Sequence, residues 1–125
     1  MNKIAIFCLL ALAILLGWPQ PTKCVTMSVV TVTAYHPGVY SKGSPKGITA
    51  SGRRVAEGMI AVSKDVERNL DLDFGDRLLV HGMGVFEFQD RMHPRMRHKV
   101  DIFMKSYKKA RRFGVRRYVV LVKMT

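Results

Sequence analysis

The segment Met27 to Tyr35, with the sequence MSVVTVTAY, decides the fold class of this chain of 125 residues. From Val30 onwards aliphatic residues alternate with Thr or Tyr, and this period of two predicts a strand with one buried face. Val32 falls on one side of that strand, and Thr33 and Tyr35 fall on the other. The segment therefore indicates a β protein with this strand at the start of its folded part.

Short apolar runs follow along the chain, and each is bounded by glycine or polar residues and is too short for a helix. Gly82 and Gly84 lie between two of these runs, and glycine adopts the positive φ angles that a tight hairpin needs. A loop is expected over residues 37–52, which are rich in Gly, Pro, Ser and Lys. Five further strands are expected at residues 59–62, 78–81, 85–88, 100–103 and 118–122.

One short helix is expected near the C-terminus, because Ser106 is a good N-cap and Gly114 suits the position after a helix. Tyr107, Ala110 and Phe113 share its predicted inner face, and four Lys or Arg residues lie on the outer side. Six short strands with one C-terminal helix predict a mainly β fold, a small six-stranded β-barrel. An irregular link or a short helical turn is expected over residues 66–74.

The N-terminus has the pattern of a signal peptide, with Lys3 before an apolar run over residues 4–18 and Pro19 after it. The run is shorter than the roughly 20 residues of a transmembrane helix. Residues 1–24 are therefore interpreted as a cleaved signal peptide, with an uncleaved anchor as the alternative, and residues 27–125 as one domain. The mature chain is expected to be exported, to the periplasm or cell envelope, and to have no membrane span.

The formal net charge of +12 is concentrated at the C-terminal end, where residues 91–125 contain twelve Lys or Arg and only one acid. Such a surface attracts polyanions of any kind. A nucleic-acid binder would need Phe103, Tyr107 and Tyr118 to be exposed as stacking rings, and no nucleic acid is expected for an exported protein. The four histidines lack the spacing of a zinc site, so no metal and no cofactor are expected.

Two carboxylates are the candidates for chemistry, Asp90 at the end of a predicted strand and Asp101 inside another. In one interpretation Asp101 pairs with the basic residues of segment 91–99, which would lower its pKa and only balance charge. In the other, burial or the second carboxylate raises its pKa, as a glycosidic acid and base requires. The sequence leaves both interpretations open.

Seven short motifs, taken in order, carry a resemblance to a known family. They are VTAY at 32–35, TASG at 49–52, GMIAV at 58–62, FGD at 74–76, QD at 89–90, VDIF at 100–103 and ARRFG at 110–114. This order resembles the 3D (three-aspartate) domain, the double-psi β-barrel of stationary-phase survival proteins and of the catalytic part of membrane-bound lytic transglycosylase A. The resemblance covers residues 32–121.

The resemblance implies that Asp101 is catalytic and that Asp90, eleven positions earlier, supports it. Ser63 stands where the family usually has its first aspartate, and segment 91–99 differs from the Thr-Gly and glycine loop of the family. The implied activity is cleavage of peptidoglycan glycan strands with 1,6-anhydro products, as in lytic transglycosylases. A non-catalytic cell-wall-binding module with the same barrel is the alternative. The candidates for glycan binding are Thr33, Tyr35, Thr49, Ser51 and Ser63.

Overall fold

The computed structural model describes residue 17, residues 26–36 and residues 47–124. Apart from Gly17, the predicted signal segment lies outside the described residues, and so do residues 37–46 of the predicted loop. No helix in the described parts of the chain is both long enough and apolar enough to cross a membrane.

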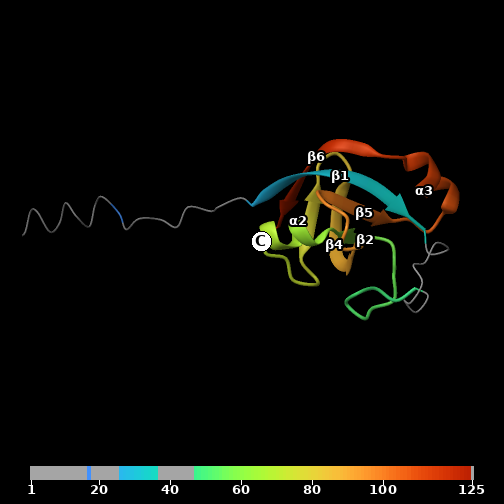
Figure 1. Ribbon diagram of the computed structural model, residues 1–125, viewed down its shortest axis with the longest axis horizontal. Helices are drawn as coiled ribbons and strands as arrows, with labels where there is room; N and C mark the ends of the chain where they lie inside the picture. The colour runs from blue at the N-terminus through green and yellow to red at the C-terminus, as the bar shows by residue number, and fades with distance from the viewer. Residues whose placement is uncertain (1–16, 18–25, 37–46, 125) are drawn as a thin grey trace, which may run out of the picture.

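Six strands form a closed barrel in the order β1-β5-β2-β4-β3-β6 (Figure 1). The predicted mainly β fold with a six-stranded barrel is therefore confirmed. The strands are β1 (Met27–Tyr35), β2 (Met59–Val62), β3 (Arg77–Val80), β4 (Gly84–Arg91), β5 (Lys99–Phe103) and β6 (Arg116–Lys123).

The pairing combines parallel and antiparallel neighbours. The pairs β1–β5 and β2–β4 are parallel. The other four pairs are antiparallel. Parallel neighbours need long crossover connections, so the order of the strands in the barrel differs from their order in the chain. The crossovers bring β5 between β1 and β2, and this position decides where Asp101 lies.

The core fills the inside of the barrel with alternate residues of every strand, as the period of two predicts. The strands contribute to this core cluster the buried side chains of Val30, Val32, Ile60, Val62, Leu78, Val80, Phe88, Val100, Ile102 and Leu121. The helix α2 and the turn after it add Val66, Leu70 and Leu72 to the same cluster.

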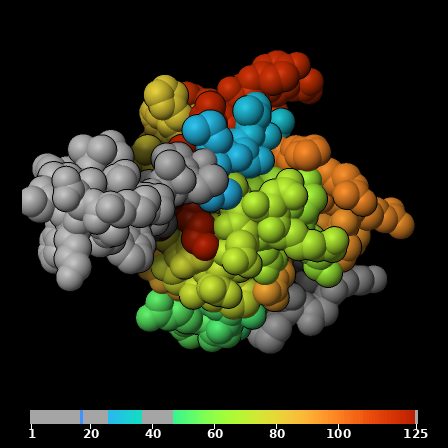
Figure 2. All heavy atoms as spheres, turned by 90° about the vertical axis from the view of Figure 1, so that its left-hand side faces the viewer, coloured from blue at the N-terminus to red at the C-terminus, as the bar shows by residue number. Residues whose placement is uncertain are grey.

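Two short helices accompany the barrel in the described residues. The first, α2 (Lys64–Asn69), begins after Ser63 and occupies the first part of segment 66–74, where a short helical turn or an irregular link is expected. It has six residues, which are too few to show a helical period in the sequence. Asp65 and Glu67 in its first turn stabilise the helix, because their negative charges interact favourably with the helix dipole. Figure 2 shows α2 in yellow-green on the face below the first residues of β1.

The C-terminal helix α3 (Tyr107–Phe113) agrees with the prediction at both ends. The Ser106 hydroxyl accepts a hydrogen bond from the Lys109 N–H, and Gly114 has a φ of 65°. The prediction that Tyr107 lies on the inner face is wrong, because this side chain is 55% exposed. Tyr107 is the first residue of the helix, and its ring makes an edge contact with His36 rather than with the core.

The hairpin of β3 and β4 also matches the prediction, with positive φ angles at Gly82 and Gly84. However, β4 extends three residues beyond its predicted end at Phe88. Gln89, Asp90 and Arg91 are polar and break the apolar pattern, yet the parallel pairing with β2 keeps them extended. Asp90 therefore lies within a strand, not after one.

Two adjacent leucines of β3 test whether alternate residues of a strand point into the core and outwards. Leu78 is fully buried and Leu79 is 37% exposed. We expect Leu78→Ala to lower the free energy of unfolding by about 2–5 kcal/mol, and Leu79→Ala to lower it by less than about 1 kcal/mol, because only the first leaves a cavity. Urea denaturation of both variants measures the difference. Equal losses would show that the alternation along β3 does not decide which leucine lies in the core.

Candidate active site

The two candidate carboxylates lie in one row across the outer wall of the barrel. Thr33 of β1 is in register with Asp101 of β5, which is in register with Ala61 of β2, and Ala61 is in register with Asp90 of β4. Laterally paired residues share a face of a sheet, and adjacent strands lie about 4.8 Å apart. Two strand spacings separate the Cα atoms of Asp90 and Asp101 by about 10 Å, with the small residue Ala61 between them in the row.

Asp101 is held in a partly buried position by its neighbour on β1. The Thr33 hydroxyl donates a hydrogen bond of 2.9 Å to Oδ1 of Asp101. Val100 and Ile102, on either side of Asp101 in the strand, both point into the core. The alternation along β5 thus turns Asp101 outwards, toward the row of candidate residues.

Asp90 attaches a loop to the end of β4. Its Oδ1 atom accepts hydrogen bonds of 2.9 Å from the backbone N–H groups of Ala50 and Arg91. The Ser51 N–H donates to the carbonyl oxygen of Gln89 at 3.1 Å. The TASG segment therefore lies beside Asp90, at one end of the carboxylate row. Asp90 positions this loop in addition to contributing its charge.

The electrostatic environment of Asp101 differs from that of an ordinary aspartate. Burial raises the pKa of the Asp101 carboxyl from 3.8 to about 6, the hydrogen bond from Thr33 opposes this rise, and the negative charge of Asp90 adds to it. A carboxyl group with such a pKa carries a proton in part of the molecules near neutral pH, as a general acid must.

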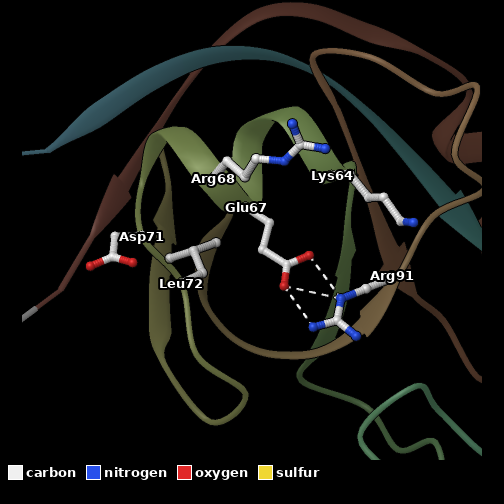
Figure 3. Close-up of a pocket in the computed structure, with 6 residues that line it drawn as sticks. All are labelled: Lys64, Glu67, Arg68, Asp71, Leu72 and Arg91. Atoms are coloured by element: carbon white, nitrogen blue, oxygen red, sulfur yellow. Dashed lines mark hydrogen bonds and ion pairs between the residues drawn. The ribbon is translucent and has the colours of Figure 1, made fainter.

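The basic residues of segment 91–99 do not neutralise Asp101. The guanidinium group of Arg91 binds both carboxylate oxygens of Glu67 on α2, with distances of 2.8–3.0 Å, and stacks on the ring of Phe74. Figure 3 shows this pair in a pocket beside α2. No ion pair between described residues includes Asp101. The interpretation that its charge is balanced by a neighbouring cation therefore finds no partner in the described part of the chain.

Of the predicted glycan-binding residues, the structure brings Thr33 and Ser51 to the two aspartates and buries Thr49 and Ser63. The Thr33 hydroxyl bonds to Asp101, and Ser51 lies in the loop that Asp90 holds. Thr49 is only 5% exposed, and its hydroxyl bonds to the Ser51 hydroxyl and donates to the carbonyl oxygen of Arg53. Ser63 is fully buried, and its hydroxyl accepts a hydrogen bond of 3.2 Å from the Lys99 N–H, so it joins β2 to β5 beneath the surface. Tyr35 lies two residues after Thr33 on β1. Its ring makes an edge contact with the ring of Phe103, with 5.5 Å between the ring centroids.

Two residues of the site could not be predicted from the sequence. Ala61 provides the small side chain between the aspartates, and the Ala50 N–H connects the loop to Asp90. Neither residue type has a chemical signature, so only their position in the motifs GMIAV and TASG could have drawn attention to them.

No group of three or more His, Cys, Asp or Glu within the described ranges is arranged to hold a metal ion. Protein-family models and curated protein sequences give no match to this chain. Membership of the three-aspartate family therefore stays a prediction from the motifs.

The raised pKa predicts how stability depends on pH. Because the pKa of Asp101 in the folded protein exceeds its ordinary value, the ionised carboxyl destabilises the fold above pH 6, by at most about 3 kcal/mol, and this loss vanishes below about pH 4. Asp101→Asn keeps an acceptor for Thr33 and removes the charge. We expect the variant to be more stable than the wild type at pH 8 and equally stable at pH 4.

Thermal unfolding across pH 4–8 measures this difference. Asp71→Asn is the matched control, because Asp71 is an exposed aspartate on the turn after α2. A stability difference between Asp101→Asn and the wild type that does not change with pH contradicts the assigned environment.

The neighbours of Asp101 should move its pKa in opposite directions. We expect Thr33→Val to raise it, because the hydrogen bond to the ionised form is lost, and Asp90→Asn to lower it, because a like charge is removed. Thr31→Val, two residues away on the same face of β1, is the control and should leave the pKa unchanged. Carbon-13 NMR titration of the Asp101 carboxyl measures all three, and a shift of the same sign in both site variants would rule out this arrangement.

Proposed function

We propose that the protein cleaves the glycan strands of peptidoglycan in the manner of a lytic transglycosylase, with Asp101 as acid and base. The observation that carries the proposal is the partly buried Asp101, which has a pKa of about 6 and faces Asp90 across Ala61. The closed six-stranded barrel with two parallel strand pairs and the order of the seven motifs support the same proposal.

The reaction requires one group that first donates and then accepts a proton. The protonated Asp101 carboxyl donates its proton to the glycosidic oxygen between N-acetylmuramic acid and N-acetylglucosamine as the C1–O bond breaks. The resulting carboxylate takes the proton of the C6 hydroxyl of the same muramic acid residue while O6 bonds to C1. The products are a 1,6-anhydro end and a free 4-hydroxyl, and Asp101 regains its proton.

The remaining groups of the site fit this reaction as positioning groups. The Thr33 hydroxyl fixes the orientation of Asp101 and favours its ionised form, which the second half of the reaction needs. The charge of Asp90 favours the protonated form, which the first half needs. The loop that Asp90 holds brings Ser51 to the same side, where its hydroxyl is a candidate for a hydrogen bond to the glycan, and the buried Thr49 hydroxyl holds Ser51 in place at 2.9 Å.

The decisive experiment incubates the protein with purified sacculi and detects anhydro-muropeptides by mass spectrometry. We expect product from the wild type and from the Asp71→Asn control, and a rate at least about 100-fold lower from Asp101→Asn, because the acid and base is lost. The wild-type rate should fall about tenfold per pH unit well above pH 6, as the acid loses its proton.

Two outcomes would reject the enzyme. Sacculus binding by all three proteins without any anhydro product would leave the alternative, a cell-wall-binding module with the same barrel. Equal product from the wild type and Asp101→Asn would move the chemistry away from Asp101.

A further inference from the structure

A second surface of the barrel is apolar and has no role in the proposed reaction. On the outer wall of β1, β6, β3 and β4, Met27 is in register with Val122, Val122 with Leu79, and Leu79 with Val85. Val29 and Val120 form the next row. Met27 and Val29 are more than half exposed, and Leu79 and Val85 are exposed to a lesser degree. We call these six residues the apolar wall.

Alternating strands normally place polar residues on an outward face that meets only water. A continuous apolar surface across four strands instead indicates a site that contacts a protein, a membrane or another apolar partner. The apolar wall is therefore unlike the rest of the outer surface, where the aspartate row is polar.

The end of the apolar wall is strongly cationic. Residues 102–125 contain eight Lys or Arg and no acid. Seven of these cations lie from Lys105 to Arg117, just before α3, on α3 and at the start of β6, and all seven are exposed. None of the seven forms an ion pair with another described residue. In Figure 1, β6 and β1 run along the upper side of the barrel and α3 lies at one end of that side.

Tyr118 lies where the cations meet the apolar wall. Its side chain is 86% exposed and its backbone has a φ of 57°, a left-handed conformation that is costly for a bulky residue. The irregular pairing of β1 and β6 between Val30 and Val32 falls at this point, and such a bulge redirects side chains. Val115, in the link between α3 and β6, is 59% exposed. The fold thus holds an aromatic ring in solvent at the expense of backbone strain.

We propose that the apolar wall and the cations of residues 105–117 form a docking face for a lipid bilayer with anionic headgroups. Cations attract such headgroups, and tyrosine favours the boundary between headgroups and acyl chains. The aliphatic wall distinguishes this occupant from a nucleic acid, because it offers no ring for stacking. Of the three rings that base stacking would use, Tyr107 and Tyr118 are exposed near the cations, and Phe103 is buried.

The test places a fluorescent reporter on the proposed face. The chain has a single tryptophan, Trp18, so Trp18→Phe with Tyr118→Trp leaves one reporter on the docking face. The matched control is Trp18→Phe with Ile48→Trp, since Ile48 is exposed in the loop beside the aspartate row. With vesicles of phosphatidylcholine and phosphatidylglycerol (7:3) that carry brominated acyl chains, we expect the reporter at position 118 to be quenched several-fold more than the reporter at position 48.

Variants that lack exposed cations test whether electrostatic attraction contributes to bilayer binding. Lys108→Gln with Arg112→Gln removes two cations one helical turn apart on α3, and Arg95→Gln with Arg97→Gln removes the same charge from the exposed segment before β5. Co-sedimentation with anionic vesicles should fall roughly tenfold or more for the α3 pair and less than about threefold for the control pair. Any contribution of the apolar N-terminal segment is common to all variants, and pure phosphatidylcholine vesicles measure it.

The proposal does not depend on the proposed activity, so Asp101→Asn should bind vesicles as the wild type does. Equal quenching at positions 118 and 48, or equal losses from the two charge variants, would overturn it. A lipid-free dimer in which the reporter at position 118 is already shielded would assign the face to a second copy. Tight binding of an oligonucleotide without any bilayer binding would assign it to nucleic acid.

Discussion

β1 closes the barrel, and both the core and the two outer faces are built around it. This strand pairs in parallel with β5 on one side and antiparallel with β6 on the other, so it joins the two ends of the sheet. Its inward residues, Val30 and Val32, complete the core, while its outward residues face two different surfaces. Thr33, on the β5 side, meets Asp101, and Met27 and Val29, on the β6 side, begin the apolar wall.

The site follows from register more than from any single contact. A shift of β5 by one residue against β1 and β2 would turn Asp101 inwards and a core residue outwards, because side chains alternate along a strand. The fully buried Val100 and Val62, which pair with each other, prevent such a shift. Core packing therefore holds a carboxyl group at a position where burial and a second carboxylate raise its pKa. The ionised Asp101 lowers the stability of the fold, and local destabilisation of this kind is found at catalytic groups.

Two faces with different chemistry share one barrel. The face of β1, β5, β2 and β4 carries hydroxyls and carboxylates suited to a sugar polymer. The face of β1, β6, β3 and β4 is apolar and ends in a cluster of cations. If both proposals hold, the protein rests on the membrane with one wall while another wall acts on the glycan. Because the two faces meet along β1, the membrane position would also orient the site.

Elements whose physical signal is local could be predicted from the sequence. The period of two in residues 27–35, the glycines of the β3–β4 hairpin and the cap residues Ser106 and Gly114 were sufficient, because each reflects a preference of a few neighbouring residues. The pair Asp90 and Asp101 could also be singled out, from its place in the motif order. Only the tertiary structure decided that Ala61 separates the pair, that Arg91 turns to Glu67, that Ser63 is buried and that Tyr118 projects into solvent. These outcomes depend on strand register and on a bulge between segments more than 80 residues apart, and no local pattern of residues records them.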